Sequence, residues 1–127
     1  LGGGGHTTAL LAHTAPSGRV LGIDADPAAI RRVGLKLAEA VATNRLTLVP
    51  GNFGNLATLA AQHGFVPVDG LLLDLGVSCF QLETAVRGFA FGQDGPLDMR
   101  MNRSAQVTGA DVVNSYQPEC LKEIVDQ

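Results

Sequence analysis

The chain has 127 residues, enough for one domain, and its hydrophobic content of 46% is typical of a packed core rather than of a disordered protein. Its net charge of −3 excludes a global basic field that would attract nucleic acid, but it leaves room for a local binding site. Cys79 and Cys120 lack metal-binding spacing, so we expect free thiols and no metal, and no apolar run is long enough to span a membrane.

The predicted elements of the first half alternate between helix and strand. A glycine-rich turn at residues 1–6 is followed by a helix at 7–14, a strand at 19–23, a helix at 26–43, a strand at 46–49, a helix at 55–63 and a strand at 69–75. Two short helices are expected later, at 109–115 and 118–125. The alternation is typical of a parallel sheet with right-handed crossovers, and it predicts an α/β fold.

The most informative segment runs from Asp69 to Met101. Its first seven residues, DGLLLDL, are typical of a buried strand, which would carry Asp74 to the edge of the sheet. The remainder is glycine-rich and too irregular for a helix, but its many apolar side chains argue against disorder. Long loops in compact domains are usually functional, and open α/β sheets bind ligands at the carboxyl ends of their strands. We therefore expect a binding site beside Asp74.

Four consecutive glycines, Gly2–Gly5, precede the first helix, where backbone amides can approach an anionic ligand closely. Asp24 ends the next strand, at the distance where an acidic residue binds the ribose of a cofactor. Asp26 is explained at least as well as the N-cap of the following helix. Thr7 and Thr8 break the dinucleotide pattern G-x-G-x-x-G/A, and no P-loop Lys follows the glycines.

S-adenosylmethionine is the cofactor that suits this spacing. The glycine backbone would hold its methionine part, and Asp24 would accept hydrogen bonds from its ribose hydroxyls. Its adenine would lie at the strand end that carries Asn52 and Phe53. A lone phenylalanine is also common in a core, so Phe53 is either a ring contact or a packing residue.

Eight stretches follow the order and spacing of one protein family. They are GGGGHT (2–7), GIDADP (22–27), GNF (51–53), DGLLLDLGVS (69–78), QLE (81–83), RGFAF (87–91), DGPLDMRM (94–101) and ADVVN (110–114). Through them the chain resembles the S-adenosylmethionine-dependent cytosine-N4 methyltransferases of small-subunit ribosomal RNA, the RsmH or MraW family. The DGPLDMRM stretch is highly specific, whereas the glycine turn is not.

The resemblance implies a Rossmann-like class I methyltransferase core with a helical domain inserted into it. Residues 1–104 would form part of the S-adenosylmethionine-binding core, with a substrate loop at 76–104, and residues 105–127 would begin the inserted domain. The family's proteins are longer, so we expect an incomplete sheet. The implied cofactor site comprises Gly4, Gly5, His6, Asp24, Phe53, Asp74 and Gln81. His6 and Gln81 enter through the resemblance alone.

The implied reaction methylates an exocyclic amine, which is a poor nucleophile and needs a hydrogen-bond acceptor. Asp74 is well placed as an acceptor, either for the cofactor, which is the role we favour, or for N4 as a catalytic residue, and the carbonyls of Leu75 and Gly76 are the alternatives for N4. In the substrate loop the candidates are Arg87, Asp94, Asp98 and Arg100. Asp94, Asp98 and Arg100 form an ion pair that pins the loop, or else Arg87, Arg100 and Arg103 contact RNA phosphates while the loop shapes the pocket for an extruded cytosine.

The expected partner is ribosomal RNA within the small subunit, in the bacterial cytoplasm or, alternatively, in a mitochondrion. Two other functions stay open. One is a methyltransferase that uses the same cofactor on another acceptor, and the other is a non-catalytic scaffold for ribosome assembly. Methylation without ribosomal RNA would favour the first, and failure to bind the cofactor would favour the second.

Overall fold

The computed structural model describes residues 1–126. The chain divides into two compact units, Leu1–Gly76 and a second unit that starts at Val77. None of the helices in residues 1–126 is long and apolar enough to cross a membrane.

A parallel pair of strands forms the centre of the first unit. β1 (Val20–Asp24) pairs with β2 (Leu46–Pro50), and the register places Val20 opposite Leu46 and Asp24 opposite Pro50. The two carboxyl ends therefore lie side by side, and the amide of Gly51 donates to the Asp24 carbonyl at 3.0 Å. The predicted α/β class and the parallel pairing are confirmed.

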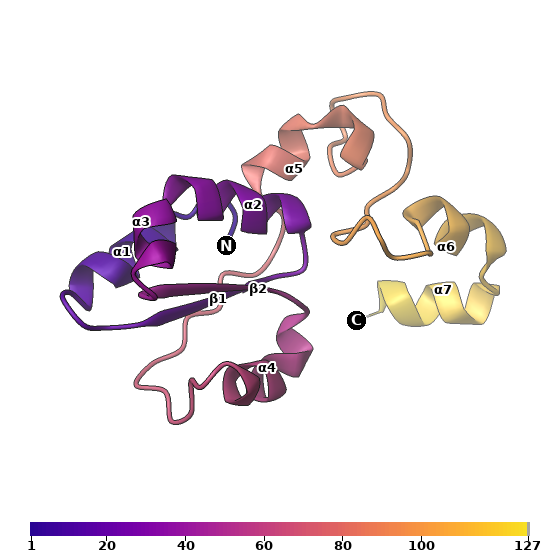
Figure 1. Cartoon of the computed structure of the whole chain (residues 1–127). Coiled ribbons are helices and arrows are strands. Elements are labelled where there is room, and N and C mark those ends of the chain that lie inside the picture. The colour runs from indigo at the N-terminus through magenta and orange to yellow at the C-terminus, as the bar shows by residue number, and fades with distance from the viewer. Residues whose placement is uncertain (127) are drawn as a thin grey trace. The chain divides into compact units, whose positions relative to one another are not determined.

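Helices cover both faces of this strand pair. α2 (Pro27–Lys36) and α3 (Ala38–Ala42) lie on one side of the strands and α4 (Leu56–Gln62) lies on the other (Figure 1). α1 (Gly5–His13) contributes Leu11 to a core cluster with Val33 of α2 and Leu46 of β2. Burial of these apolar side chains, each worth about 1.5–3 kcal/mol, holds the glycine turn and the strand ends together.

The single helix expected at residues 26–43 is divided in two. Leu37 has φ −117° and ψ 35°, which interrupts the helix between α2 and α3. Leu37 and Ala40 pack against the core cluster. A continuous helical pattern in the sequence cannot reveal such an interruption, because the interruption depends on where the core lies.

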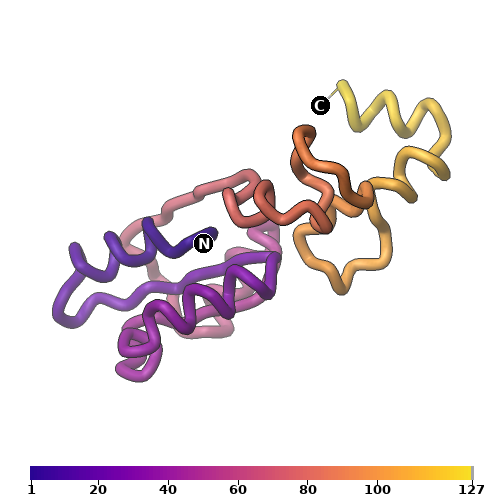
Figure 2. Tube along the Cα trace, turned by 90° about the horizontal axis from the view of Figure 1, so that it is seen from above, coloured from indigo at the N-terminus to yellow at the C-terminus, as the bar shows by residue number. Residues whose placement is uncertain are grey.

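The strand expected at residues 69–75 is absent from the structure, and this prediction is wrong for the present chain. The segment carries no regular secondary structure, and Figure 2 traces it from α4 toward α5 without a helical coil. Leu71, Leu73 and Leu75 are each more than half exposed. A strand needs a neighbour to pair its amides and carbonyls, and among residues 1–126 only β1 and β2 are paired.

The second unit consists of short helices joined by an irregular loop. α6 (Gly109–Ser115) and α7 (Pro118–Val125) have the predicted bounds, while Gln127, the last residue of the predicted segment 105–127, lies outside the described residues. The 76–104 segment was expected to contain no helix, but α5 (Cys79–Glu83) and a 3-10 turn, η2 (Ala85–Arg87), form there. Reciprocal capping by Ser78 and Gln81 explains how α5 forms in a glycine-rich sequence.

Candidate functional site

The glycine turn leads directly into α1. Gly4 adopts φ 81° and ψ 16°, a left-handed conformation, and a Cβ at this position would lie 3.3 Å from Val33 Cγ2. A Cβ at Gly5 would meet nothing within 4 Å, so the space beside Gly5 is open. No side chain caps the N-terminus of α1 in the described structure. The turn thus presents bare backbone at a helix N-terminus, which favours anionic groups.

Two cationic side chains of α2 bind the backbone carbonyls of this turn. Arg32 Nη1 donates to the Gly2 carbonyl at 3.0 Å, and Lys36 Nζ donates to the Gly3 carbonyl at 2.9 Å. The two residues are four apart, which places them on one face of the helix. Sequence reasoning missed both, although this spacing was a visible signal that they act together.

Asp24 lies at the carboxyl end of β1. Its Oδ1 accepts from the Asp26 amide at 2.8 Å, and its Oδ2 lies 3.0 Å from the backbone nitrogen of Leu1. The carboxylate is therefore beside the glycine turn and can accept from donor groups there. Asp26 is buried, and its side chain accepts from the Ala28 amide at 2.9 Å as the N-cap of α2, which confirms the capping alternative.

Phe53 follows the carboxyl end of the neighbouring strand. It begins a 3-10 turn, η1 (Phe53–Asn55), which is capped by the Asn52 side chain through the Gly54 amide at 2.8 Å. Phe53 is 57% exposed. Its ring is therefore outside the core and available to a flat ligand group.

Asp74 reaches the glycine turn from the irregular segment. Its Oδ2 lies 3.0 Å from Nδ1 of His6 in the first turn of α1. Both side chains are more than half exposed. The first unit thus brings Gly4, Gly5, His6 and Asp74 together at the N-terminus of α1, with Asp24 beside the turn.

Gln81 belongs to the second unit, where it is 5% exposed. Its Oε1 accepts from the Ser78 amide at 2.9 Å, and its own backbone amide donates to Ser78 Oγ at 3.3 Å. Its Nε2 lies 3.3 Å from Met101 Sδ. The S-x-x-Q spacing is a helix-start signal that sequence reasoning did not use.

Arg87 and Arg100 hold the loop at residues 76–104 together through internal hydrogen bonds. Arg87 is 7% exposed, and its Nη2 donates to the carbonyls of Arg100 and Met101 at 3.0 and 3.1 Å. Arg100 binds Asp98 through two nitrogens, Nε to Oδ1 at 2.8 Å and Nη2 to Oδ2 at 2.7 Å. The loop was expected either to be pinned by an ion pair or to contact RNA phosphates, and this geometry favours the ion pair.

The ion pair between Asp98 and Arg100 shifts the pKa of both side chains. Hydrogen bonds from the side chain and backbone of Arg100 hold the pKa of this carboxyl well below its ordinary range, and Asp98 in turn raises the pKa of Arg100. A hydrogen bond from Thr108 lowers the pKa of Asp111. By contrast, Asp94 and Arg103 are exposed residues of the loop.

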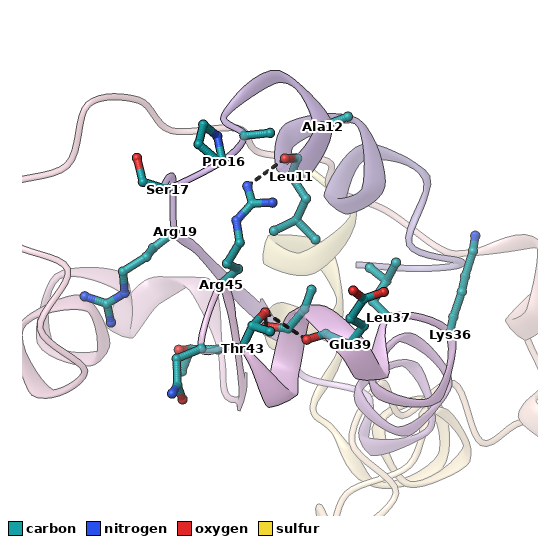
Figure 3. Close-up of a pocket in the computed structure, with 14 residues that line it drawn as sticks. Leu11, Ala12, Pro16, Ser17, Arg19, Lys36, Leu37, Glu39, Thr43 and Arg45 are labelled. Atoms are coloured by element: carbon teal, nitrogen blue, oxygen red, sulfur yellow. Dashed lines mark hydrogen bonds between the residues drawn. The ribbon is translucent and has the colours of Figure 1, made fainter.

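An open hollow of about 970 Å³ lies elsewhere on the first unit, at the amino ends of the strands (Figure 3). Its wall includes Arg19, Lys36 and Arg45. Arg45 has a structural role, because its guanidinium donates to the Leu11 carbonyl at 2.7 Å and to the Gly18 carbonyl at 3.0 Å. None of the predicted site residues lines this hollow, which is at the opposite end of the strands from Asp24.

Comparison with known proteins identifies the family. A sequence model of the MraW methylase family matches residues 1–127. The chain belongs to the MraW methylase family. Relatives named "Ribosomal RNA small subunit methyltransferase H" are 49% identical over 124 residues in Syntrophotalea carbinolica, 51% over 123 residues in Thermomicrobium roseum and 45% over 127 residues in Geobacter sulfurreducens.

These matches cover 98%, 97% and 100% of the chain, but 39%, 37% and 40% of the respective relatives. The chain thus spans about two fifths of the length of these MraW methylase relatives. Membership of a methylase family implies a methyl donor. It also agrees with the α/β architecture, which here is a partial Rossmann-like methyltransferase fold.

Proposed function

We propose that the whole protein transfers a methyl group from S-adenosylmethionine to N4 of a cytidine in small-subunit ribosomal RNA. The observation that carries the proposal is the meeting of the glycine turn, Asp24 and Asp74 at one end of the first unit. The names of the relatives supply the substrate class, since each is named as a methyltransferase of small-subunit ribosomal RNA.

The residues present fit S-adenosylmethionine. The open space at Gly5 and the uncapped start of α1 leave backbone amides for the carboxylate of the methionine part. Asp24 offers carboxylate oxygens to ribose hydroxyls, and the exposed Phe53 offers a ring face to adenine. When bound, this cofactor supplies an electrophilic methyl group on a sulfonium sulfur.

Asp74 is the proposed catalytic acceptor. The lone pair of a cytosine N4 is delocalised into the ring, so the amine must be held in position and relieved of a proton. The Asp74 carboxylate is exposed beside the glycine turn, and it can accept the hydrogen bond of the amine and then its proton. Such positioning can lower a barrier by several kcal/mol, of order 7–11 at best. The carbonyls of Leu75 and Gly76 are the alternative acceptors.

The second unit carries Gln81 and the loop at residues 76–104, and their roles are proposed from the family resemblance. The network of Arg87, Asp98 and Arg100 gives the loop a defined shape, and we propose that this shape forms part of the pocket for an extruded cytosine. Asp94 and Arg103 are the exposed charges of the loop, and Arg103 is suited to an RNA phosphate. Gln81 is the proposed cofactor contact on α5.

The test uses the full-length protein, unmodified small ribosomal subunits and labelled S-adenosylmethionine, with the product nucleoside identified by mass spectrometry. We expect N4-methylcytidine, and we expect Asp74→Ala to reduce its formation by about 10²-fold or more. Asp69→Ala is the matched control, because it removes an exposed carboxylate from the same segment.

Other outcomes separate the alternatives. Label on protein or on another nucleoside would keep the methyl donor and reject the cytidine. No transfer, together with no cofactor binding by calorimetry, would leave the scaffold for ribosome assembly. Retained activity in Asp74→Ala would move the acceptor role to the carbonyls of Leu75 and Gly76. Detection of the activity in bacterial cytoplasmic extracts would fit the proposed location.

A further inference from the structure

Asp74 is the proposed catalytic group, and its side chain acts only if its orientation is fixed. Its segment forms neither helix nor strand, and its side chain is 56% exposed. An exposed carboxylate has rotational freedom about its side-chain bonds, and fixing it in one orientation costs conformational entropy. A misplacement of about 1 Å in a reacting group can cost about 10²-fold in rate, so Asp74 needs a partner that fixes it.

His6 is that partner. Its Nδ1 lies 3.0 Å from Asp74 Oδ2, although the two residues are 68 positions apart in the sequence. Within residues 1–126, the contact with His6 is the one hydrogen bond to the Asp74 carboxylate. His6 itself is held by α1, whose first turn also receives a bond from Thr8 Oγ1 to the Gly4 carbonyl at 2.7 Å.

The chemistry of the pair determines which nitrogen carries the proton. An ionised carboxylate only accepts hydrogen bonds, so Nδ1 of His6 must be the donor. In the neutral ring Nε2 then keeps its lone pair, and Asp74 keeps Oδ1 for another donor. The arrangement orients an acid–base group through a hydrogen-bonded neighbour, as catalytic His–Asp pairs do with the roles of the two residues reversed.

We propose that His6 is a positioning residue for Asp74, which it holds through Nδ1–H so that Oδ1 faces the amine that is methylated. This inference rests on the proposed function and deepens it. It gives His6 a role toward Asp74 in addition to any contact with the cofactor. The role belongs to the Nδ1 side of the ring, which distinguishes it from contacts that Nε2 makes.

The first test observes the contact without any reaction. Long-range proton–nitrogen NMR on the full-length protein, with histidine labelled at its ring nitrogens, reports which nitrogen carries hydrogen, and His6→Asn identifies the His6 signals by their loss. We expect a hydrogen on Nδ1 in the wild type. In Asp74→Ala, which removes the acceptor, we expect the His6 ring to revert to a mixture of tautomers. A wild-type ring with hydrogen on Nε2 alone would overturn the proposal.

The second test compares three substitutions in the methyl-transfer assay. Asn places its amide nitrogen near the position of Nδ1, whereas Gln places it near Nε2 and Leu has no donor. We expect His6→Gln and His6→Leu to lower kcat about 10²-fold, and His6→Asn to lower it less than tenfold. Calorimetric Kd values for S-adenosylmethionine should differ from the wild-type value by a similar factor in all three variants, because the variants are expected to differ from one another in kcat.

Two results would overturn the positioning role. One is equal loss of kcat in His6→Asn and His6→Leu, and the other is a loss in all variants that appears only in cofactor Kd. If the wild type transfers no methyl group, the proposed function fails and the role in catalysis falls with it. The tautomer measurement would still decide whether His6 donates to Asp74, so the two failures are distinguishable.

Discussion

Gly88 shows how a single residue sets the shape of the loop at residues 76–104. It ends η2 with φ 70° and ψ 24°, and a Cβ there would overlap the carbonyl oxygen of Pro96. We therefore expect Gly88→Ala to lower the free energy of unfolding by at least about 1–2 kcal/mol, because both the backbone conformation and the close approach oppose a side chain. Chemical denaturation measures this difference.

Gly92→Ala is the control for that substitution. Gly92 lies in the same loop, but a Cβ there would meet nothing within 4 Å. We expect its stability to stay within about 0.5 kcal/mol of the wild type. Equal destabilisation by the two substitutions would contradict the close approach of Gly88 to Pro96.

Asp98 makes stability depend on pH. Its pKa in the folded protein is lowered by Arg100, whereas the unfolded chain has an ordinary value of about 4. The folded state therefore gains stability that is fully present above pH of about 4 and is lost as pH falls further toward the folded pKa. Asp111 contributes in the same direction. Urea unfolding at several pH values measures the effect.

The substitution Asp98→Asn should remove most of this dependence. We expect the variant to be less stable than the wild type at pH 7, with a smaller change in the free energy of unfolding between pH 7 and pH 3. Asp94→Asn is the matched control, because Asp94 is an exposed carboxylate in the same loop. If the two variants had the same pH profile, the pair with Arg100 would not stabilise the fold.

At the scale of elements, capping determines where the short helices begin. Thr108 Oγ1 accepts from the Asp111 amide at 3.2 Å, and the Asp111 side chain accepts from the Thr108 amide at 2.8 Å. We expect Thr108→Ala to cost about 0.5–2 kcal/mol, because α6 has only seven residues and loses a cap. Thermal unfolding followed by circular dichroism checks this prediction.

Ser104→Ala serves as the comparison for Thr108→Ala. Ser104 is an exposed residue just before α6, outside its capping box. Its substitution should leave the unfolding midpoint nearly unchanged. A similar shift in both variants would show that the reciprocal cap does not stabilise α6.

At the scale of the whole molecule, the segment at residues 71–75 has the sequence of a buried strand and the exposure of a loop. In the 127-residue chain we expect its amides to exchange with solvent within seconds, whereas those of β2 should be protected by their pairing with β1. Hydrogen–deuterium exchange with mass spectrometry resolves the two segments.

The same measurement on a full-length protein tests the strand that the sequence predicts. Protection of residues 71–75 there would show that the segment pairs in a larger sheet. Slow exchange already in the 127-residue chain would contradict the open conformation described above. Fast exchange in both would reject the strand altogether.

Local patterns in the sequence determined most of the elements. Helical spacing and turn residues predicted α1, α2, α4, α6 and α7 in order, and the Asp-Pro start of α2 is the N-cap that the structure contains. The glycine turn, Asp24 and Asp74 were predicted as one site from the glycine motif, its spacing to Asp24 and a strand that would end near Asp74, although that strand does not form within residues 1–126. These features depend on neighbours in the sequence or on the general geometry of parallel strands, so they could be inferred without coordinates.

Tertiary structure alone decided how these groups are held. The bond between His6 and Asp74, the hold of Arg32 and Lys36 on the glycine turn, and the burial of Arg87 all join residues that are distant in the sequence. The missing third strand follows the same rule, because an apolar segment becomes a strand only where a neighbour pairs its backbone. Composition specifies what a segment can form, and its contacts determine what it does form.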